Sequence, residues 1–476
     1  MKPKLNEDWL AVCLGLLLFA LSCASFFGVD ALGWVVTTAV WTSPAKMLAP
    51  ASKMYAAFSG LGSLLATYVF LLALMTIGAA ALGLNLWRFI KGFTAVFCAG
   101  YLSWMLGSWA YIAATPDKRA GFHIGWSLNL TNEAGYIVAL LAGLFVGNFL
   151  PVLAARMKEA IRPELYIKTA IVILGGFLGV TAAEQLGLAT SVMFRGVCAI
   201  IEAYLIYWAL VYYVARRYFK FSREWSAPLA SGISICGVSA AIATGSAIRA
   251  RPVVPVMVSS LVVIFAVIEL LVLPFAAQTF LAHQPMVAGA WMGLAVKTDG
   301  AAVTSGAVAE SLIRAKALAD FGIRYKPGWI MGVTTTVKVF IDVFIGIWAF
   351  ILAWIWSAKI DPKHGEKVKP VEIWQRFPKF VLGYLATFAI ILSIGLLAPG
   401  VVPKAKAAMN QANVFRGIFF VMTFFTIGVV SNFRKLWQEG IGKLALVYVL
   451  CLFGFIIWIG LAISWVFFHG VTPPVA

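Results

Sequence analysis

Long apolar segments, separated by short polar loops, recur along the whole chain. Each is long enough to cross a bilayer, which takes about 20 residues of helix, and none alternates as membrane β-strands do. Helices and closed barrels are the only structures that cross lipid. We therefore predict an all-α polytopic membrane protein with about 13 transmembrane helices, at residues 9–29, 58–84, 88–115, 134–153, 165–183, 191–214, 227–250, 253–281, 285–313, 328–357, 377–398, 411–432 and 444–468.

Spacing along the chain predicts two regions. Residues 1–130 are expected to form an N-terminal membrane region of about three helices, and residues 131–476 a ten-helix core. The C-terminal core contains the denser sequence of spans, with short loops between them.

Composition agrees with a membrane protein. Of 476 residues, 62% are hydrophobic and only 12% are charged, whereas a soluble domain carries about 25% charged residues. The net charge of +18 comes from basic residues scattered between the spans. This distribution is typical of topology signals and of contacts with anionic headgroups, not of nucleic-acid binding. Six cysteines form no CxxC pair, so no metal site or disulfide framework is indicated.

The distribution of basic residues also predicts orientation. With a cytoplasmic N-terminus, loops on the inner side hold 21 Lys and Arg residues and loops on the outer side hold 14. The bias has the sign of the positive-inside rule. Four basic residues between positions 314 and 326 fall on the outer side, which leaves one nearby span open to reassignment. We expect a multi-pass protein of the cell membrane, the bacterial inner membrane.

One stretch inside a predicted span lacks the large side chains that hydrocarbon favours. It is SGISICGVSAAIATGSAIRAR, residues 231–251, in which small and hydroxyl residues predominate and no charge precedes Arg249. Small residues in a membrane either let helices pack closely or let a helix unwind around a solute. We interpret it as a broken helix beside a transport site, with the candidate substrate-binding residues Ser234, Cys236, Gly237 and Ser239.

A second small, polar interruption is predicted at the end of span 411–432, which holds Thr426, Gly428, Ser431 and Asn432. These interruptions fall in the fourth and ninth of the ten core spans. Interrupted helices at corresponding positions of two halves are typical of inverted-repeat transporters. We therefore predict two inverted five-helix repeats, and Asn432 joins the candidate substrate-binding residues.

Ionisable side chains within spans are further candidates, because a charge at the helix centre costs about 2.5–3.5 kcal/mol. Lys297 and Asp299 could form a structural pair, or could lie in a loop between two shorter spans. Alternatively, Lys297 attracts an anionic substrate and nearby hydroxyls donate hydrogen bonds, which adds the candidates Thr298, Asp299, Thr304 and Ser305.

Lys338 and Asp342 lie one helical turn apart on one face. They could form an ion pair that stabilises the span, or could compensate charge during transport. Glu202 and Glu269 also lie in apolar runs and could be structural or proton-carrying carboxylates. The sequence does not rank these two glutamates.

Enzyme motifs are absent from the sequence. The four histidines are far apart, and there is no P-loop, GxSxG or HExxH motif. We expect no enzymatic activity, no catalytic residue, no metal site and no cofactor, while a coupling ion, Na⁺ or H⁺, remains open.

Several segments together resemble the sulfate exporter family of the bile acid/arsenite/riboflavin transporter superfamily. Two carry the strongest likeness, SICGVSAAIATGSAIRA at 234–250 and GLAVKTDGAAVTSG at 293–306. Three further segments are similar to other helices of that family: LLAGLFVGNFLP at 140–151, IKTAIVILGGFLGV at 167–180 and FFTIGVVSNFRKL at 424–436.

This resemblance implies a secondary transporter with broken, crossing fourth and ninth helices and alternating access. It also implies that the N-terminal membrane region, residues 1–130, is additional to the family's core. One departure concerns the second signature, where the family carries His-Glu and then Gln, and this chain has Lys297, Thr298 and Ala301. Lysine offers a fixed positive charge where histidine would titrate near neutral pH. The departure predicts an anionic substrate near Lys297. It also argues against assigning the family's coupling mechanism directly to this chain.

These observations together predict a secondary active transporter of a small anion: sulfate, sulfite, a sulfonate or a related organic anion. The alternative is an anion-binding membrane sensor or scaffold that does not translocate its ligand. A channel is disfavoured because broken helices do not provide a continuous polar pore. Expected partners are the small anion and the lipid bilayer, and homodimerisation through residues 1–130 is an open alternative.

Overall fold

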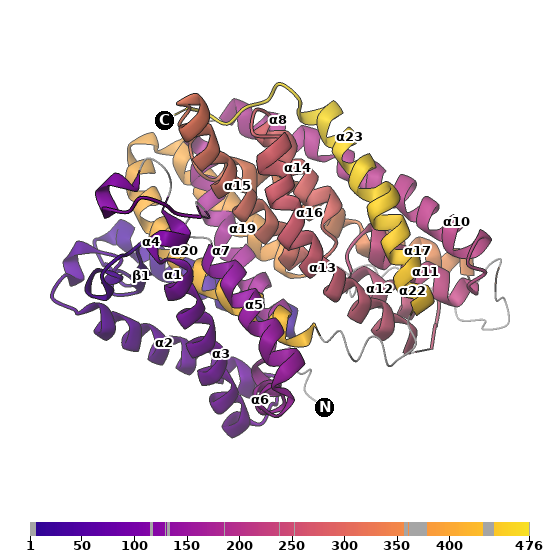
Figure 1. Ribbon diagram of the computed structural model, residues 1–476, viewed down its shortest axis with the longest axis horizontal. Coiled ribbons are helices and arrows are strands. Elements are labelled where there is room, and N and C mark those ends of the chain that lie inside the picture. The colour runs from indigo at the N-terminus through magenta and orange to yellow at the C-terminus, as the bar shows by residue number, and fades with distance from the viewer. Residues whose placement is uncertain are drawn as a thin grey trace. The chain divides into compact units, whose positions relative to one another are not determined.

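The computed structural model describes residues 6–114, 118–128, 130, 134–184, 186–237, 239–251, 253–356, 360, 378–431 and 442–475. The chain is all-α apart from a two-stranded antiparallel sheet of β1 (Val36–Thr38) and β2 (Leu48–Pro50) (Figure 1). It forms two compact units. Unit 1 comprises residues 1–189, 314–324 and 379–430, and unit 2 comprises residues 190–313, 325–378 and 431–476.

Within the described residues, ten helices are long and apolar enough to cross a membrane, or 11 if the bent pair Ala134–Phe149 and Pro151–Ala160 is one span. The protein is therefore a multi-pass membrane protein. The ten spans are Glu7–Phe27, Gly60–Ala81, Leu86–Gly107, Pro163–Glu184, Leu186–Arg217, Val253–Phe280, Trp329–Ile355, Phe380–Leu397, Pro399–Val430 and Gly442–Phe468. The count is below the predicted 13 because segments 227–250 and 285–313 are each divided between two helices, neither pair of which gives an apolar spanning helix, and segment 134–153 is the bent pair.

Unit 1 is built around α7 (Pro163–Glu184), which is almost completely buried and is contacted by α1, α19 and α20. Glycines on α7 allow this packing. A Cβ atom at Gly175 would lie 2.3 Å from the carbonyl oxygen of Tyr384 on α19. The other helices of unit 1 are α1 (Glu7–Cys23), α2 (Gly60–Ala81), α3 (Leu86–Gly107), α4 (Ala110–Ala113), α5 (Ala134–Phe149), α6 (Pro151–Met157), α19 (Phe380–Leu397) and α20 (Val402–Val430). Short 3₁₀ turns occur at Ala24–Phe27, Pro44–Lys46, Lys53–Tyr55, Ala120–Phe122, Lys158–Ala160 and Pro399–Val401.

The predicted break in the ninth core span does not begin at Thr426 or Gly428, because α20 is continuous through both residues and ends at Val430, directly before Ser431. Its small residues serve close packing instead. A Cβ atom at Gly428 would lie 2.4 Å from the carbonyl oxygen of Leu140 on α5, and the Thr426 hydroxyl donates to Met422 O at 2.7 Å. Asn432, which was predicted at the end of this span, lies outside the described residues.

Unit 2 contains four spanning segments and four shorter helices. The spanning segments are α8–α10, α13 (Val253–Phe280), α16–α17 and α22–α23. Two helices, α8 (Leu186–Gly196) and α15 (Asp299–Phe321), contain residues of both units. The remaining elements are α9 (Cys198–Ile200), the π-helical turn Ile201–Tyr207, α10 (Trp208–Arg217), α11 (Arg223–Ser234), α12 (Ser239–Ala247), α14 (Pro285–Ala295), α16 (Trp329–Val343), α17 (Ile345–Ile355), α22 (Gly442–Cys451), the π-helical turn Leu452–Ile456 and α23 (Ile457–Phe468).

The fourth core span is broken, as predicted. Its two helices fold back on each other, so this segment does not cross the membrane. The side chain of Glu224 in the first turn of α11 accepts hydrogen bonds from the backbone and guanidinium of Arg251, which follows α12, at 2.8–3.2 Å. Midway along the pair, Thr244 Oγ1 donates to Ser231 Oγ at 2.7 Å. We call α11 and α12 hairpin 1. These hydrogen bonds also hold the pKa of the Glu224 carboxyl below its usual value.

The segment 285–313 is likewise a helical hairpin and not a single span. Thr334 on α16 contacts both of its arms: its hydroxyl donates to Gly289 O on α14 at 2.7 Å, and a Cβ atom at Gly306 on α15 would lie 2.4 Å from Thr334 Oγ1. These glycines lie at similar distances before and after the turn at residues 296–298, so the arms run antiparallel. We call α14 and the unit 2 part of α15 hairpin 2.

The two hairpins enter unit 2 from opposite ends, because α13 joins the end of one to the start of the other. Its 28 residues span about 42 Å, more than the roughly 30 Å of the hydrocarbon core. By contrast, the 12 residues of α11 reach about 18 Å, roughly 60% of that hydrocarbon depth. With a cytoplasmic N-terminus, Arg249 and Arg251 then move to the inner side, which raises the inner basic total from 21 to 23 and lowers the outer one from 14 to 12.

Hairpin 1 can be tested by the sidedness of cysteine labelling. We expect Lys220→Cys and Arg249→Cys to react with an impermeant maleimide from the same side of the membrane, and His283→Cys from the opposite side. All three positions are exposed, and the background would have the exposed Cys13 and Cys98 replaced. Labelling of positions 220 and 249 from opposite sides would show that the fourth core span crosses the membrane.

Candidate functional site

The tips of hairpins 1 and 2 meet inside unit 2. The backbone N–H of Gly237 donates to the carbonyl oxygen of Lys297 at 2.6 Å. Gly237 is required by the closeness of this contact, since a Cβ atom there would lie 2.2 Å from Val262 Cγ1 and 3.2 Å from Thr298 Cγ2. The two stretches singled out in the sequence are therefore neighbours.

Acidic side chains and Lys338 form a buried cluster beside these tips. Cys236 Sγ on hairpin 1 donates to Asp299 Oδ1 on hairpin 2 at 2.9 Å. Lys338 Nζ donates to the carbonyl oxygen of Ile235 at 2.8 Å and lies 3.5 Å from Asp299 Oδ1. Ligand atoms of Cys236, Asp299 and Asp342 all lie within 4.8 Å of one another. The predicted partner of Lys338 was Asp342, whereas the ion pair described within 4.0 Å joins Lys338 to Asp299 on a different helix.

One thiol and two carboxylates form a donor set that could hold a cation, since carboxylate oxygens suit hard cations. The Lys338 ammonium lies against the same groups, so the chain itself supplies a positive charge there. This tethered cation makes a permanently bound metal ion unfavourable and suits exchange between the ammonium and a mobile cation.

Lys297, which also lies at the tip of hairpin 2, belongs to a second group of buried side chains. Its ammonium donates to Leu294 O and lies 4.4 Å from the centre of the Tyr207 ring. Its backbone N–H donates to Glu269 Oε2 at 3.0 Å, and Tyr448 donates its hydroxyl to Glu269 Oε1 at 2.9 Å. Lys297 and Asp299 therefore have different partners, and a structural pair between them is not what holds this tip.

Glu202 lies close to the same group. A Cβ atom at Gly460 on α23 would lie 2.7 Å from Tyr207 Oη and 3.4 Å from Glu202 Oε1, so both side chains approach one point of that helix. The carboxylate of Glu202 is completely buried. Sequence reasoning left Glu202 and Glu269 unranked and missed Tyr207 and Tyr448.

The predicted hydroxyl residues have different surroundings. Thr298 caps α15 by accepting from Ala301 N at 3.2 Å, and Thr304 Oγ1 donates to the carbonyl oxygen of Gly300. By contrast, the hydroxyls of Ser234 and Ser305 are buried without a hydrogen-bond partner. A buried polar group without a partner costs about 1–3 kcal/mol, so these two are available to a solute or water. Ser239 is the first residue of α12.

Charge in this buried region does not balance within the side chains themselves. Four carboxyl groups and two ammonium groups are buried there: Glu202, Glu269, Asp299, Asp342, Lys297 and Lys338. If all were ionised, two negative charges would lack a lysine. Uncompensated buried charge is strongly unfavourable, so among these six described groups the excess favours protonation of carboxyls or binding of a cation.

Comparisons with known proteins identify the family. Residues 91–447 match the family model described as "Conserved hypothetical protein 698". A UPF0324 membrane protein of Nitrosomonas europaea is 42% identical over 478 residues, which cover 99% of this chain and 97% of that protein. The chain belongs to the UPF0324 family.

Two further relatives match a smaller share of this chain. An uncharacterized protein of Archaeoglobus fulgidus is 50% identical over 31% of this chain and 90% of its own length. A UPF0324 membrane protein of Nitratidesulfovibrio vulgaris is 28% identical over 84% of this chain and 63% of its own length. No solved structure matches. The Nitrosomonas match includes the N-terminal region, so that region also occurs in a relative.

The tip contact of this UPF0324 protein predicts a stability effect. Gly237→Ala would force a methyl group against Val262, and overpacking of this kind costs about 1–3 kcal/mol. We expect a lower thermal unfolding midpoint by tryptophan fluorescence. Gly454→Ala is the matched control because no atom lies within 4 Å of its added Cβ. Equal midpoints for the two variants would contradict the close tip contact.

Proposed function

We propose that the protein is a secondary transporter that couples a cation, H⁺ or Na⁺, to the movement of a small anion. The observation that carries this proposal is the meeting of two opposed hairpins at the Gly237–Lys297 hydrogen bond, with buried charges on both sides of it. Interrupted helices that meet at mid-depth and carry charged groups are typical of transport sites.

An anionic substrate is supported by the groups at the tips. The N-termini of α12 and α15 lie at the hairpin tips, and the positive ends of half-helices favour anions. Lys297 adds a charge, and the hydroxyls of Ser234 and Ser305 offer donors that have no hydrogen-bond partner among the described residues. Sulfate, sulfite, a sulfonate or a related organic anion would match this combination.

Cation coupling is supported by the charge balance. The carboxyl groups already outnumber the lysines, so an anion entering the same region requires protons or cations to accompany it. Asp299, Asp342 and Cys236 form the coupling site in this proposal. Lys338 holds Ile235 of one hairpin and Asp299 of the other, so a cation at Asp299 would loosen the tie between them. Alternating access then follows from separation of the tips.

A second candidate is exchange of cations alone, which the acidic cluster around Lys338 favours. A third is an anion sensor that binds without transport. Flux measurements in proteoliposomes distinguish all three, because only the first moves an anion and only the third moves no ion.

A ligand screen tests the anion site. A true substrate should raise the thermal midpoint, since ligand at 100 times its Kd stabilises by about 2.7 kcal/mol. We would screen sulfate, sulfite, sulfonates and carboxylates with and without sodium. Lys297→Ala should abolish the stabilisation and the flux, and the control Lys220→Ala, which removes one exposed charge, should retain both. Wild-type transport by Lys297→Ala would rule out this anion site.

A second variant tests coupling. Asp299→Asn removes the carboxylate that pairs with Lys338, and we expect the dependence of flux on the Na⁺ or H⁺ gradient to disappear, with a loss of at least about tenfold in coupled uptake. Glu224→Gln is the control, because it removes a carboxylate of hairpin 1 from a partly exposed ion pair that contributes about 0–1 kcal/mol. Unchanged gradient dependence in Asp299→Asn would exclude the coupling role.

A further inference from the structure

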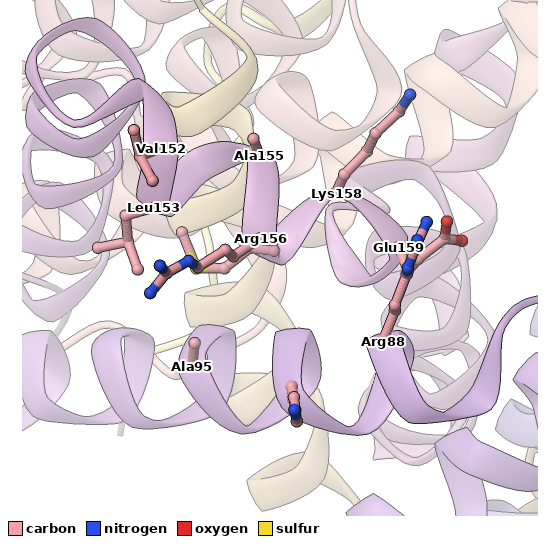
Figure 2. Close-up of a pocket in the computed structure, with 10 residues that line it drawn as sticks. Arg88, Ala95, Val152, Leu153, Ala155, Arg156, Lys158 and Glu159 are labelled. Atoms are coloured by element: carbon pink, nitrogen blue, oxygen red, sulfur yellow. The ribbon is translucent and has the colours of Figure 1, made fainter.

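Basic side chains line a cavity in unit 1 that the proposed transport site does not use. Its volume is about 770 Å³, and it lies between α3 and the segment that follows α5 (Figure 2). The charged residues of the lining are Arg88, Lys91, Arg156, Lys158 and Glu159. The lining therefore carries four basic residues and one acidic residue.

The packing of α3 places this cavity at the membrane surface. The end of α3 meets the start of α5, since a Cβ atom at Gly107 would lie 2.3 Å from Gly135 N. The start of α3 meets the segment after α5, since a Cβ atom at Gly92 would lie 3.2 Å from Met157 O. The two helices are thus antiparallel, and the chain bends by 112° between α5 and α6. Such a bend turns α6 toward the membrane plane, where the headgroups lie.

Exposed apolar and aromatic side chains surround the cavity. Phe149 is 71% exposed, Val152 67% and Trp87 66%. The Lys91 ammonium lies 4.8 Å from the Trp87 ring centre. Tryptophan beside a basic residue is typical of the interface between hydrocarbon and headgroups. Acyl chains could therefore pack beside a polar group that enters the cavity.

Within the described residues, none of the four basic side chains forms an ion pair, whereas Arg162 and Lys168 nearby in the sequence pair with Glu7 and Asp8. Figure 2 shows Arg156 reaching toward α3 near Ala95, while Arg88 and Glu159 lie toward the other end of the cavity and Lys158 extends away. Their positive charges are available to a ligand.

We propose that this cavity binds the phosphate headgroup of an anionic phospholipid. Arginine presents paired N–H donors that match phosphate oxygens, and Arg88 and Arg156 line the cavity together with Lys91. With a cytoplasmic N-terminus these residues face the inner leaflet, whose anionic lipids attract basic residues. The lipid headgroup fills the cavity, and its chains lie along Phe149 and Val152.

Lipid binding to the purified full-length protein tests the site. Native mass spectrometry and thermal unfolding would compare phosphatidylglycerol, phosphatidylcholine and inorganic phosphate. We expect phosphatidylglycerol to bind and stabilise. Each basic residue contributes about fivefold to such binding, so Lys91→Gln with Arg156→Gln should weaken it roughly 25-fold. Glu159→Gln, which removes the negative charge of the lining, should strengthen it.

The double variant Lys46→Gln with Lys404→Gln is the control, because it changes the net charge equally at two exposed positions outside the cavity lining. Phosphatidylglycerol binding that survives equally in both double variants would overturn the site. Stabilisation by inorganic phosphate alone, lost only in the Lys91 and Arg156 variant, would overturn the lipid as occupant. If the double variant fails to fold, Glu159→Gln still tests the site, because stronger phosphatidylglycerol binding is expected for it and weaker or equal binding would contradict the proposal.

Discussion

A charge buried away from water has to find a partner, and unit 2 is organised by how Lys338 meets this requirement. Its ammonium donates to the carbonyl oxygen of Ile235 at the end of α11 and pairs with Asp299 at the start of α15. One side chain from α16 therefore fixes the tips of both hairpins. If the Lys338–Asp299 pair is lost, a buried charge is left without full compensation. If the Lys338–Ile235 hydrogen bond is lost, a buried carbonyl oxygen is left without full compensation. The position of the tips and the ionisation of the cluster are consequently linked.

Much of this arrangement follows from sequence, but not its topology. Gly237, Cys236, Lys297 and Asp299 could be chosen because small residues and charges are costly or useless against lipid. Their contact could not be predicted, because an interrupted helix that crosses and one that folds back have the same composition. What distinguishes them is the pairing of Glu224 with Arg251, a contact between residues that a crossing helix would hold far apart.

Gly428 illustrates the opposite error. Glycine inside a membrane helix has two physical uses, unwinding and close packing, and sequence alone gives no means to choose between them. In α20, Gly428 allows close packing against α5. In hairpin 1, Gly237 allows the close approach of the two hairpin tips. Tyr207 and Tyr448 were missed for a related reason. Their hydroxyls matter only because folding brings them to Ile456 and Glu269, and nothing local separates them from other tyrosines.

The division of charge between the two sides of the tips limits how a transport cycle could run. Asp299 and Lys338 compensate each other directly, whereas the Lys297 ammonium donates to Leu294 O and makes a cation–π contact with the Tyr207 ring. An added anion would therefore be favoured beside Lys297, and an added cation beside Asp299. Because Lys297 and Asp299 are two residues apart at one tip, filling one position lowers the electrostatic cost of filling the other. In the proposed cycle, binding of the two ions would be cooperative, and the reciprocity of linked equilibria would require each to raise the affinity of the other by the same factor.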